Sequence, residues 1–279
     1  MFEAFYEMFE SEEQETIVLI SRVLGAGYFS KGGFWSMSAM AAAAVFCGTG
    51  RVTKKEVRLE WPVTEEERNS DMGWDRFGPD QICRLKLRPI KVEFAKGLVV
   101  PPWCVAGVVN TNEDCPELQA ILDERSKPVI IEDQALGTLE LNRYYDTFEG
   151  WIDWQGREVS LSLEVNAESK SSWSRARTAA KKFVTGQGTW DKAMREFAAK
   201  KLTGLANDWM AQDEENSRDP ETDPITEEEF ARRLALSDLT VTSGGSFTAY
   251  FDCGEMFTDH AVTVDGSLKK GVKDARIEG

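Results

Sequence analysis

The sequence has little of several residue types that common catalytic and metal sites require. Its 279 residues include one histidine, His260, so any Ser-His-Asp or Cys-His catalytic arrangement would have to use that residue. The five cysteines are odd in number and never form a C-x-x-C pair, which argues against a disulfide framework and a zinc site. Phosphate-binding glycine motifs and the G-x-S-x-G motif do not occur. We therefore expect no cofactor and no resident metal.

Basic residues and long apolar runs are also scarce. Lys and Arg total 33 against 48 Asp and Glu, a net charge of −15, which argues against nucleic acid as a partner. The first fifteen residues are acidic and contain no basic residue, unlike a secretory signal. The most apolar stretch, 34–47, is shorter than the roughly 20 residues of a membrane span. We expect a cytoplasmic protein with reduced thiols and no membrane contact.

Apolar spacing in the first half predicts helices mixed with short strands. Phe2, Phe5, Tyr6 and Phe9 repeat with helical spacing, and Ser11 with Gln14 resembles a capping box that reopens the helix as far as Leu24. A second helix is predicted over 36–46. The remaining elements predicted before residue 127 are strands within 51–63, 81–88 and 103–109, and a helix over 116–125.

The second half predicts strands, then helices, then strands. A tight hairpin turn at Gln155-Gly156 separates two strands, and Thr189 is the predicted N-cap of a long helix that reaches Trp209. Residues 208–229 read as an acidic loop, followed by a short helix after Thr226. The other predicted elements are strands over 129–131, 137–141, 148–154, 158–165, 239–241, 246–251, 257–264 and 272–277, a helix over 171–183, and hairpin turns at 243–245 and 265–266.

This order of elements predicts an α+β fold with a mostly antiparallel sheet and helices packed on one face. We place a boundary near residue 127. It separates an N-terminal α+β region, 1–127, from a C-terminal domain, 128–279, of strands, two to three helices and further strands.

The candidate site residues surround the single histidine. His260 lies beside Asp259, with Asp252 and Glu255 at the preceding turn. Such a cluster could bind a partner or ligand, hold a divalent metal or position a proton donor. On a strand, however, Asp259 and His260 would point to opposite faces, so a hydrogen-bonded structural histidine is the simpler interpretation.

Two further features invite a binding interpretation. Basic side chains gather on the 81–88 strand with Lys91, and on the 171–183 helix; either group could contact phosphate or simply balance neighbouring acids. Tryptophans crowd the second half, where core filling is the default and an exposed ring could anchor a protein interface. They are Trp151, Trp154, Trp173, Trp190 and Trp209.

The C-terminal half resembles an uncharacterised family of bacterial domains of unknown function. The resemblance rests on several short motifs, which are Leu136-Gly137-Thr138-Leu139-Glu140-Leu141-Asn142-Arg143, Phe148-Glu149-Gly150-Trp151-Ile152-Asp153-Trp154, Leu205-Ala206-Asn207-Asp208-Trp209, Gly245-Ser246-Phe247, Tyr250-Phe251 and Asp259-His260. It supplies no catalytic residues. In size and acidity its members resemble bacterial proteins that neutralise toxins or belong to conflict systems.

These observations predict a non-enzymatic, cytoplasmic protein that binds another protein, for which a basic toxin domain is one candidate. The alternative is a metal-assisted hydrolase that uses His260 with Asp252, Glu255 or Asp259. A purely structural subunit is a third interpretation. The oligomeric state is left open.

Overall fold

The computed structural model describes residues 2–30, 32–70, 76–217 and 224–279. The chain divides into two compact units, Met1–Lys127 and Pro128–Gly279, which are described separately below. Among the described residues, no helix is both long enough and apolar enough to cross a membrane. The whole chain is of the predicted α+β class, with mostly antiparallel strand pairs.

The first unit is a small β-barrel. Five strands close a ring in the order β1-β5-β6-β4-β2, because β1 pairs with both β5 and β2. The β4–β6 pair is parallel, and the connectivity is that of OB-type barrels. The elements are α1 (Glu3–Tyr6), β1 (Gln14–Phe29), β2 (Phe34–Phe46), β3 (Arg51–Thr53), β4 (Val57–Val63), α2 (Glu65–Arg68), β5 (Ile82–Pro89), α4 (Val92–Ala95), β6 (Pro102–Asn110) and α5 (Pro116–Arg125).

The helices predicted over 11–24 and 36–46 are wrong, because these segments form the long strands β1 and β2. Both faces of the two strands are buried where they meet. Val18 and Ala39 point into the barrel, whereas Leu19 and Ala43 pack outside it with Leu118 of α5. A strand covered on both sides shows no alternation of polar and apolar residues. The alanines, which favour helices in isolation, are small enough to pack inside the barrel.

The predicted N-terminal helix is also shorter than its apolar spacing indicated. Only Glu3–Tyr6 is helical, while Phe9 forms an isolated antiparallel bridge with Ile90. Phe5 and Phe9 are buried together with Phe34. The aromatic residues are therefore core residues, but a strand-like contact ends the helix after one turn.

The second unit is an eight-stranded sheet in the order β14-β13-β12-β11-β10-β9-β8-β7. All neighbours are antiparallel except β10 and β11, which are joined by a helical crossover, as a parallel pair requires. Its elements are β7 (Ile130–Asp133), β8 (Gly137–Asn142), β9 (Thr147–Trp154), β10 (Arg157–Glu164), α6 (Lys170–Thr185), α7 (Gln187–Ser217), α8 (Glu227–Arg233), β11 (Ala235–Thr242), β12 (Ser246–Asp252), the 3₁₀ turn η1 (Gly254–Phe257), β13 (Ala261–Ser267) and β14 (Gly271–Glu278).

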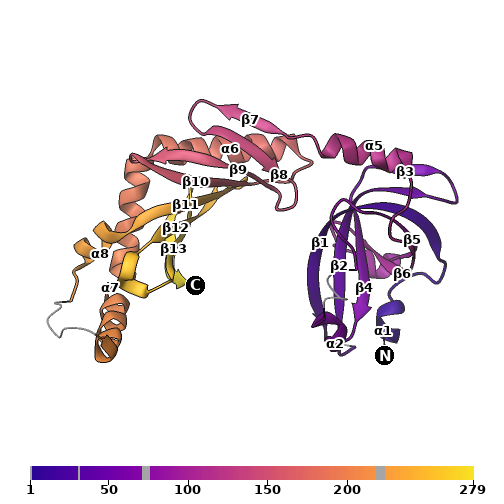
Figure 1. The fold of residues 1–279 in the computed structure, drawn as a ribbon, viewed down its shortest axis with the longest axis horizontal. Helices are drawn as coiled ribbons and strands as arrows, with labels where there is room; N and C mark the ends of the chain where they lie inside the picture. The colour runs from indigo at the N-terminus through magenta and orange to yellow at the C-terminus, as the bar shows by residue number, and fades with distance from the viewer. Residues whose placement is uncertain (1, 31, 71–75, 218–223) are drawn as a thin grey trace. The chain divides into compact units, whose positions relative to one another are not determined.

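The helices of this unit pack against one face of its sheet, as predicted. Ala176 and Phe183 of α6, and Met194 and Ala198 of α7, lie in the same core as the inward side chains of the strands, such as Val159. Figure 1 shows α6 running behind β9 and β10. One face of the sheet is thereby buried, and the other carries no helix among the described residues.

The turns between the strands are only partly as predicted. Gln155 and Gly156 form the predicted β9–β10 turn, and both have positive φ, at 54° and 77°. The turn predicted at 265–266 is wrong, because both residues lie within β13. The strand predicted from residue 257 begins at Ala261, after η1.

The acidic stretch 208–229 is not one continuous loop. Its first ten residues extend α7, which begins at Gln187, two residues before the predicted N-cap. Residues 218–223 lie outside the described residues. The short helix predicted after Thr226 is confirmed as α8, and the Thr226 hydroxyl accepts a hydrogen bond of 3.2 Å from the Glu229 N–H.

The cysteines are all free, and four of them are buried. Burial raises the pKa of the Cys83 thiol to about 11 and that of Cys104 to about 12, so both stay protonated and behave as small apolar residues. Cys253 is likewise buried and lies between β12 and η1.

Gly266 gives a test of the sheet packing. A Cβ at this position would lie 2.5 Å from the Gly271 carbonyl oxygen and 2.5 Å from the Phe247 ring. We expect Gly266→Ala to lower the free energy of unfolding by about 1–3 kcal/mol, measured by chemical denaturation. Gly244→Ala is the control, because its Cβ would meet only the Thr242 hydroxyl at 3.6 Å. Equal stability of the two variants would contradict the packing described here.

Candidate functional site

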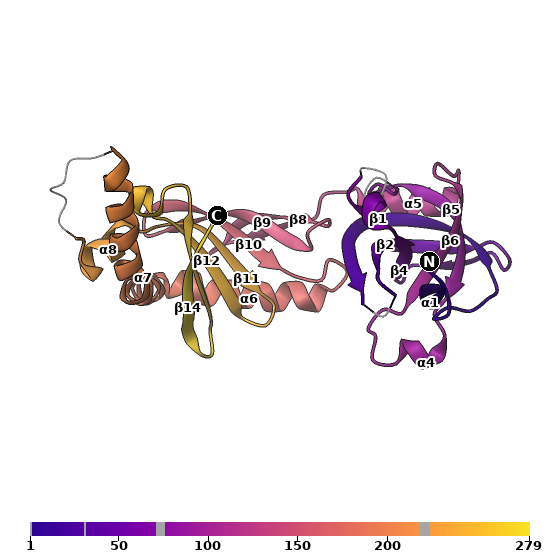
Figure 2. The ribbon, with the colours of Figure 1, turned by 90° about the horizontal axis from the view of Figure 1, so that it is seen from below.

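The helix-free side of the second unit's sheet, called the open face below, is polar. In β9, Phe148, Ile152 and Trp154 point into the core, so Glu149, Trp151 and Asp153 point the other way. The same alternation in β10 to β14 places hydroxyls and carboxylates on this side. Figure 2 shows the strands of this unit from a second direction.

Strand register brings these side chains into two rows that cross the sheet. The first row, from β9 to β14, is Trp151, Ser160, Asp238, Tyr250, Thr263 and Arg276. The second row, from β8 to β13, is Glu140, Glu149, Ser162, Thr240, Thr248 and Asp265. Carboxylates, hydroxyls and two aromatic rings therefore share one surface, with a single arginine at its edge.

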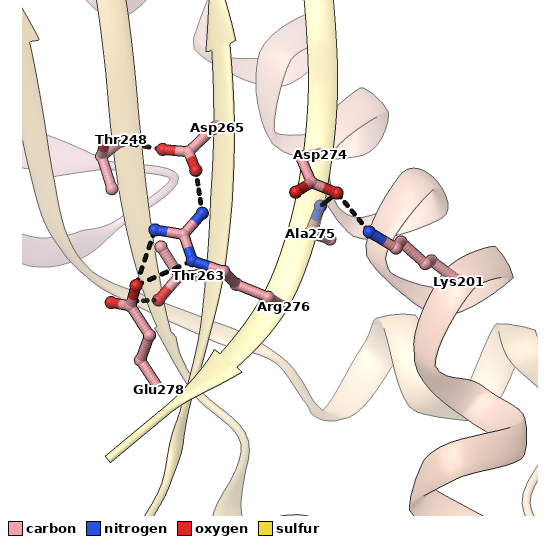
Figure 3. Close-up of polar contacts among 8 residues, drawn as sticks. All are labelled: Lys201, Thr248, Thr263, Asp265, Asp274, Ala275, Arg276 and Glu278. Carbon is pink, nitrogen blue, oxygen red and sulfur yellow. Dashed lines mark hydrogen bonds and ion pairs between the residues drawn. The ribbon is translucent and has the colours of Figure 1, made fainter.

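That arginine, Arg276, contacts two of the acids around it (Figure 3). The Arg276 guanidinium donates to Asp265 and, at 2.7 Å from its Nε, to Oε1 of Glu278. Thr248 and Thr263 donate their hydroxyls to the same two carboxylates, at 2.7 and 3.2 Å. The hydrogen bonds to Asp265 and Glu278 raise the pKa of Arg276. This network holds β12, β13 and β14 together, and both of its carboxylates contact the same guanidinium.

The described acids on β9, β10 and β11 lack such a cationic contact. Among the described residues, Glu149, Glu158, Glu164 and Asp238 form no ion pair. We call these four residues, with Trp151 and Asp153, the acidic half of the open face. Its Trp151 side chain is 61% exposed, which is unusual for a tryptophan.

Two cross-strand pairs in this region have like charges. Asp153 lies opposite Glu158, and Glu149 lies opposite Glu140. Like charges directly opposite each other weaken a sheet, so the arrangement costs stability in the isolated protein. A positively charged partner would relieve that repulsion.

A hollow of about 490 Å³ opens at one end of the acidic half. It is lined by Tyr145, Asp146, Thr147, Glu149, Ser162, Glu164, Val165 and Thr240. Asp146 links two segments beside the hollow. Its carboxylate accepts a hydrogen bond from the Ala167 N–H at 3.1 Å, and its carbonyl accepts one from the Val165 N–H at 2.8 Å. The Tyr145 side chain above it is 68% exposed.

The residues predicted around His260 lie on a different part of the unit. The His260 ring packs edge-on against Trp209 of α7, with ring centroids 5.4 Å apart, and its Nδ1 lies 3.1 Å from the Phe257 carbonyl oxygen. Asp252 accepts the Gly254 N–H at 2.8 Å and thereby stabilises the turn. Glu255 and Asp259 are exposed. A binding role for these four residues stays a prediction.

The arrangement offers no clear metal centre. Across the described parts of the chain, no three His, Cys, Asp or Glu side chains converge so as to hold a metal ion. The open face offers carboxylate and hydroxyl acceptors and exposed rings. Chemically, it suits the binding of a cationic surface.

Family comparisons cover most of the chain. Residues 133–277 match the family described as "Uncharacterized protein conserved in bacteria (DUF2262)". The chain belongs to this family. Residues 1–125 match a second model, "Domain of unknown function (DUF7021)", so the barrel has a family description of its own. The acidic half, the hollow and the His260 region all lie within the DUF2262 match.

Comparisons outside these families add little. No curated protein matches the chain. The solved structure titled "Crystal structure of the tetrameric p202 HIN2" is 8% identical, with a TM-score of 0.21, and the match covers 56% of this chain and 75% of that one.

The basic residues singled out on β5 are engaged in ion pairs across the barrel surface. Arg84 contacts Glu113 at 2.6 Å and Glu15 at 3.5 Å, while Arg88 and Lys86 contact Glu13. Single-stranded nucleic acid binding by OB-type barrels uses a positively charged groove. The ion pairs on β5 give no support to a phosphate-binding role.

The basic side of α6 in the DUF2262 region is partly engaged in the same way. Lys181 and Arg177 contact Asp133 of β7, at 2.7 and 3.6 Å, and the Asp133 side chain is only 4% exposed. Burial alone would raise the pKa of Asp133. Hydrogen bonds from Lys181 and the Ala135 N–H, with the nearby positive charges, outweigh burial and leave the pKa below its ordinary value.

This ion pair predicts a pH-dependent stability. Because the folded-state pKa is lowered, the contribution of Asp133 is present above the ordinary carboxyl pKa of about 4 and is lost as pH falls below it. We expect Asp133→Asn to destabilise the second unit by about 1–2 kcal/mol at pH 7. The difference from the parent chain should shrink toward pH 3, as measured by denaturation at several pH values. A difference that stays constant, or one shared by the exposed Glu132→Gln control, would contradict this assignment.

Sequence reasoning missed the acidic half as a unit, although it found several of its parts. The alternation in 148–154 already separates Trp151 and Asp153 from Ile152 and Trp154. That pattern was a usable signal for an exposed tryptophan beside acids. What the sequence does not contain is the register that places Asp238, about ninety residues away, in the row of Trp151.

Proposed function

We propose that this protein is a non-enzymatic binding protein that captures a positively charged protein on the open face of its second unit. The observation that carries the proposal is the acidic half, where carboxylates without ion pairs surround the exposed ring of Trp151. Opposite charge accelerates encounter and selects the partner, and a buried tryptophan supplies affinity at the centre of an interface.

Charge repulsion supports the same proposal. The like-charge pairs Asp153–Glu158 and Glu140–Glu149 weaken the free protein, and a cationic partner would turn this repulsion into attraction.

A basic toxin domain is the class of partner that we favour, by analogy with bacterial proteins of similar size and acidity that neutralise toxins. We place the activity in the cytoplasm, where five free cysteines would stay reduced. The alternative, a metal-assisted hydrolase centred on His260, is not favoured, since His260 packs against Trp209 and Asp252 stabilises a turn.

The test is affinity capture with the full chain from lysate of the bacterium that carries the gene, at low and at physiological salt. The face variant combines Glu149→Gln, Glu158→Gln and Asp238→Asn. The control variant has the same change in charge away from this face, as Glu196→Gln, Glu227→Gln and Glu228→Gln.

We expect the parent and the control variant to retain one basic protein, identified by mass spectrometry, and the face variant to lose it. Recovery of no specific partner by the parent would contradict the proposal. Equal retention by all three proteins would contradict the assignment to this face.

A further inference from the structure

We infer that the hollow beside Tyr145 binds an arginine side chain of the basic partner, an inference that rests on the proposed function. The hollow combines a concave shape, an exposed aromatic ring at its rim and carboxylates on its floor. Its volume of about 490 Å³ exceeds the needs of a single side chain, so it also admits the adjoining backbone of the partner.

The floor of the hollow comes from three adjacent strands. Glu149 lies opposite Ser162, and Thr147 lies opposite Glu164, so the two glutamates are diagonal neighbours on the β9–β10 pair. Diagonal neighbours are roughly 7–8 Å apart at their Cα atoms, within reach of long side chains that converge on one group. Thr240 of β11, paired with Ser162, completes the floor with a second hydroxyl.

The existing contacts leave acceptor capacity on both glutamates. Glu149 accepts the Thr147 hydroxyl at 2.6 Å and the Asn142 amide at 3.4 Å, and both of these donors are neutral. No cation pairs with Glu149 or Glu164 in the described chain. Both carboxylates can therefore accept hydrogen bonds from a cationic group in the hollow.

Guanidinium fits this arrangement better than ammonium does. Its planar fork can donate to two carboxylates at once, and its flat face stacks on an aromatic ring. The exposed ring of Tyr145 lines the hollow and offers such a face. A lysine ammonium would also pair with the carboxylates. It has no planar fork to donate to both acids at once and no flat face to stack on the ring.

The experiment uses the ¹⁵N-labelled full chain titrated with the acetylated tripeptide amide Gly-Arg-Gly, monitored by amide chemical shifts. We expect saturable shifts at residues 145–149, 162–164 and 240, with a dissociation constant in the millimolar range. The citrulline analogue, which has the same shape without the charge, should give none. The lysine analogue should bind at least threefold more weakly.

Variants test whether the tripeptide binds in the hollow. We expect Tyr145→Leu, and separately the Glu149→Gln and Glu164→Gln pair, to weaken tripeptide binding at least fivefold. Glu196→Gln, an exposed residue of α7 outside the open face, should leave it unchanged. Tyr145 is largely exposed, so its replacement spares the core, and unchanged shifts at distant amides confirm the fold.

The outcomes distinguish this inference from the proposed function. Absence of saturable shifts, equal binding of the citrulline peptide, or shifts centred on Trp151 would overturn the arginine assignment. If the Tyr145→Leu variant then still captures the basic partner from lysate while the face variant does not, the assignment of an arginine to the hollow is wrong. The assignment of the partner to the open face is then right. If neither the tripeptide nor a partner binds the parent chain, both proposals fail.

Discussion

Replacing Phe183 by alanine is expected to lower the free energy of unfolding of the second unit by about 3–5 kcal/mol. The Phe183 side chain is fully buried between α6 and the sheet. Its ring lies 4.8 Å from that of Trp190 and 5.0 Å from that of Phe247, so truncation removes contacts to a helix and to a strand together. The cavity left behind adds to the lost burial, because two packed layers cannot close around it.

Equilibrium denaturation followed by far-ultraviolet circular dichroism measures this effect. Phe94→Ala is the control, because Phe94 lies in the first unit and is exposed; its replacement should change stability by less than about 0.5 kcal/mol. A loss below about 1 kcal/mol for Phe183→Ala would mean that α6 does not form the main cover of the sheet.

Trp151→Ala is expected to weaken binding of the captured partner by about 2 kcal/mol, or roughly thirtyfold, mainly through faster dissociation. The ring stands on the open face among carboxylates and contributes nothing to the core, so the same change should leave the stability of the free protein within about 0.5 kcal/mol. Binding and stability are therefore separable at this position.

Surface plasmon resonance with the purified partner gives both rate constants for this variant. Tyr28→Ala is the matched control, because Tyr28 is an exposed aromatic residue of the first unit. Equal affinities for the parent chain and Trp151→Ala would remove Trp151 from the interface. A comparable loss for Tyr28→Ala would move the interface to the first unit.

Sequence reasoning worked best where a strand has one buried face. In β5, Cys83, Leu85 and Leu87 alternate with Arg84 and Lys86, and the strand was predicted from this pattern. It failed in β1 and β2, where both faces are buried and the apolar run is continuous. Gly266 shows a third case: it was read as a turn residue, but close packing against Phe247 requires the glycine.

The candidate site could likewise be predicted only in part from the sequence. Proximity in sequence grouped His260, Asp252, Glu255 and Asp259, and their binding role stays a prediction. The structure adds a ring contact between His260 and Trp209 and a turn hydrogen bond to Asp252. The acidic half joins strands that are separated by three helices, so only the fold could bring its residues together. Net charge indicated that an acidic surface exists, while the sheet register locates it.

Photo-crosslinking in cells tests most directly whether a basic protein binds the open face. The crosslinker p-benzoylphenylalanine is placed at position 151 and, for comparison, at position 192 on α7. We expect a covalent adduct with a basic protein from position 151 and none from position 192, because the partner covers the open face. Adducts that form from position 192 alone, or none from position 151 while the partner is present, would contradict it.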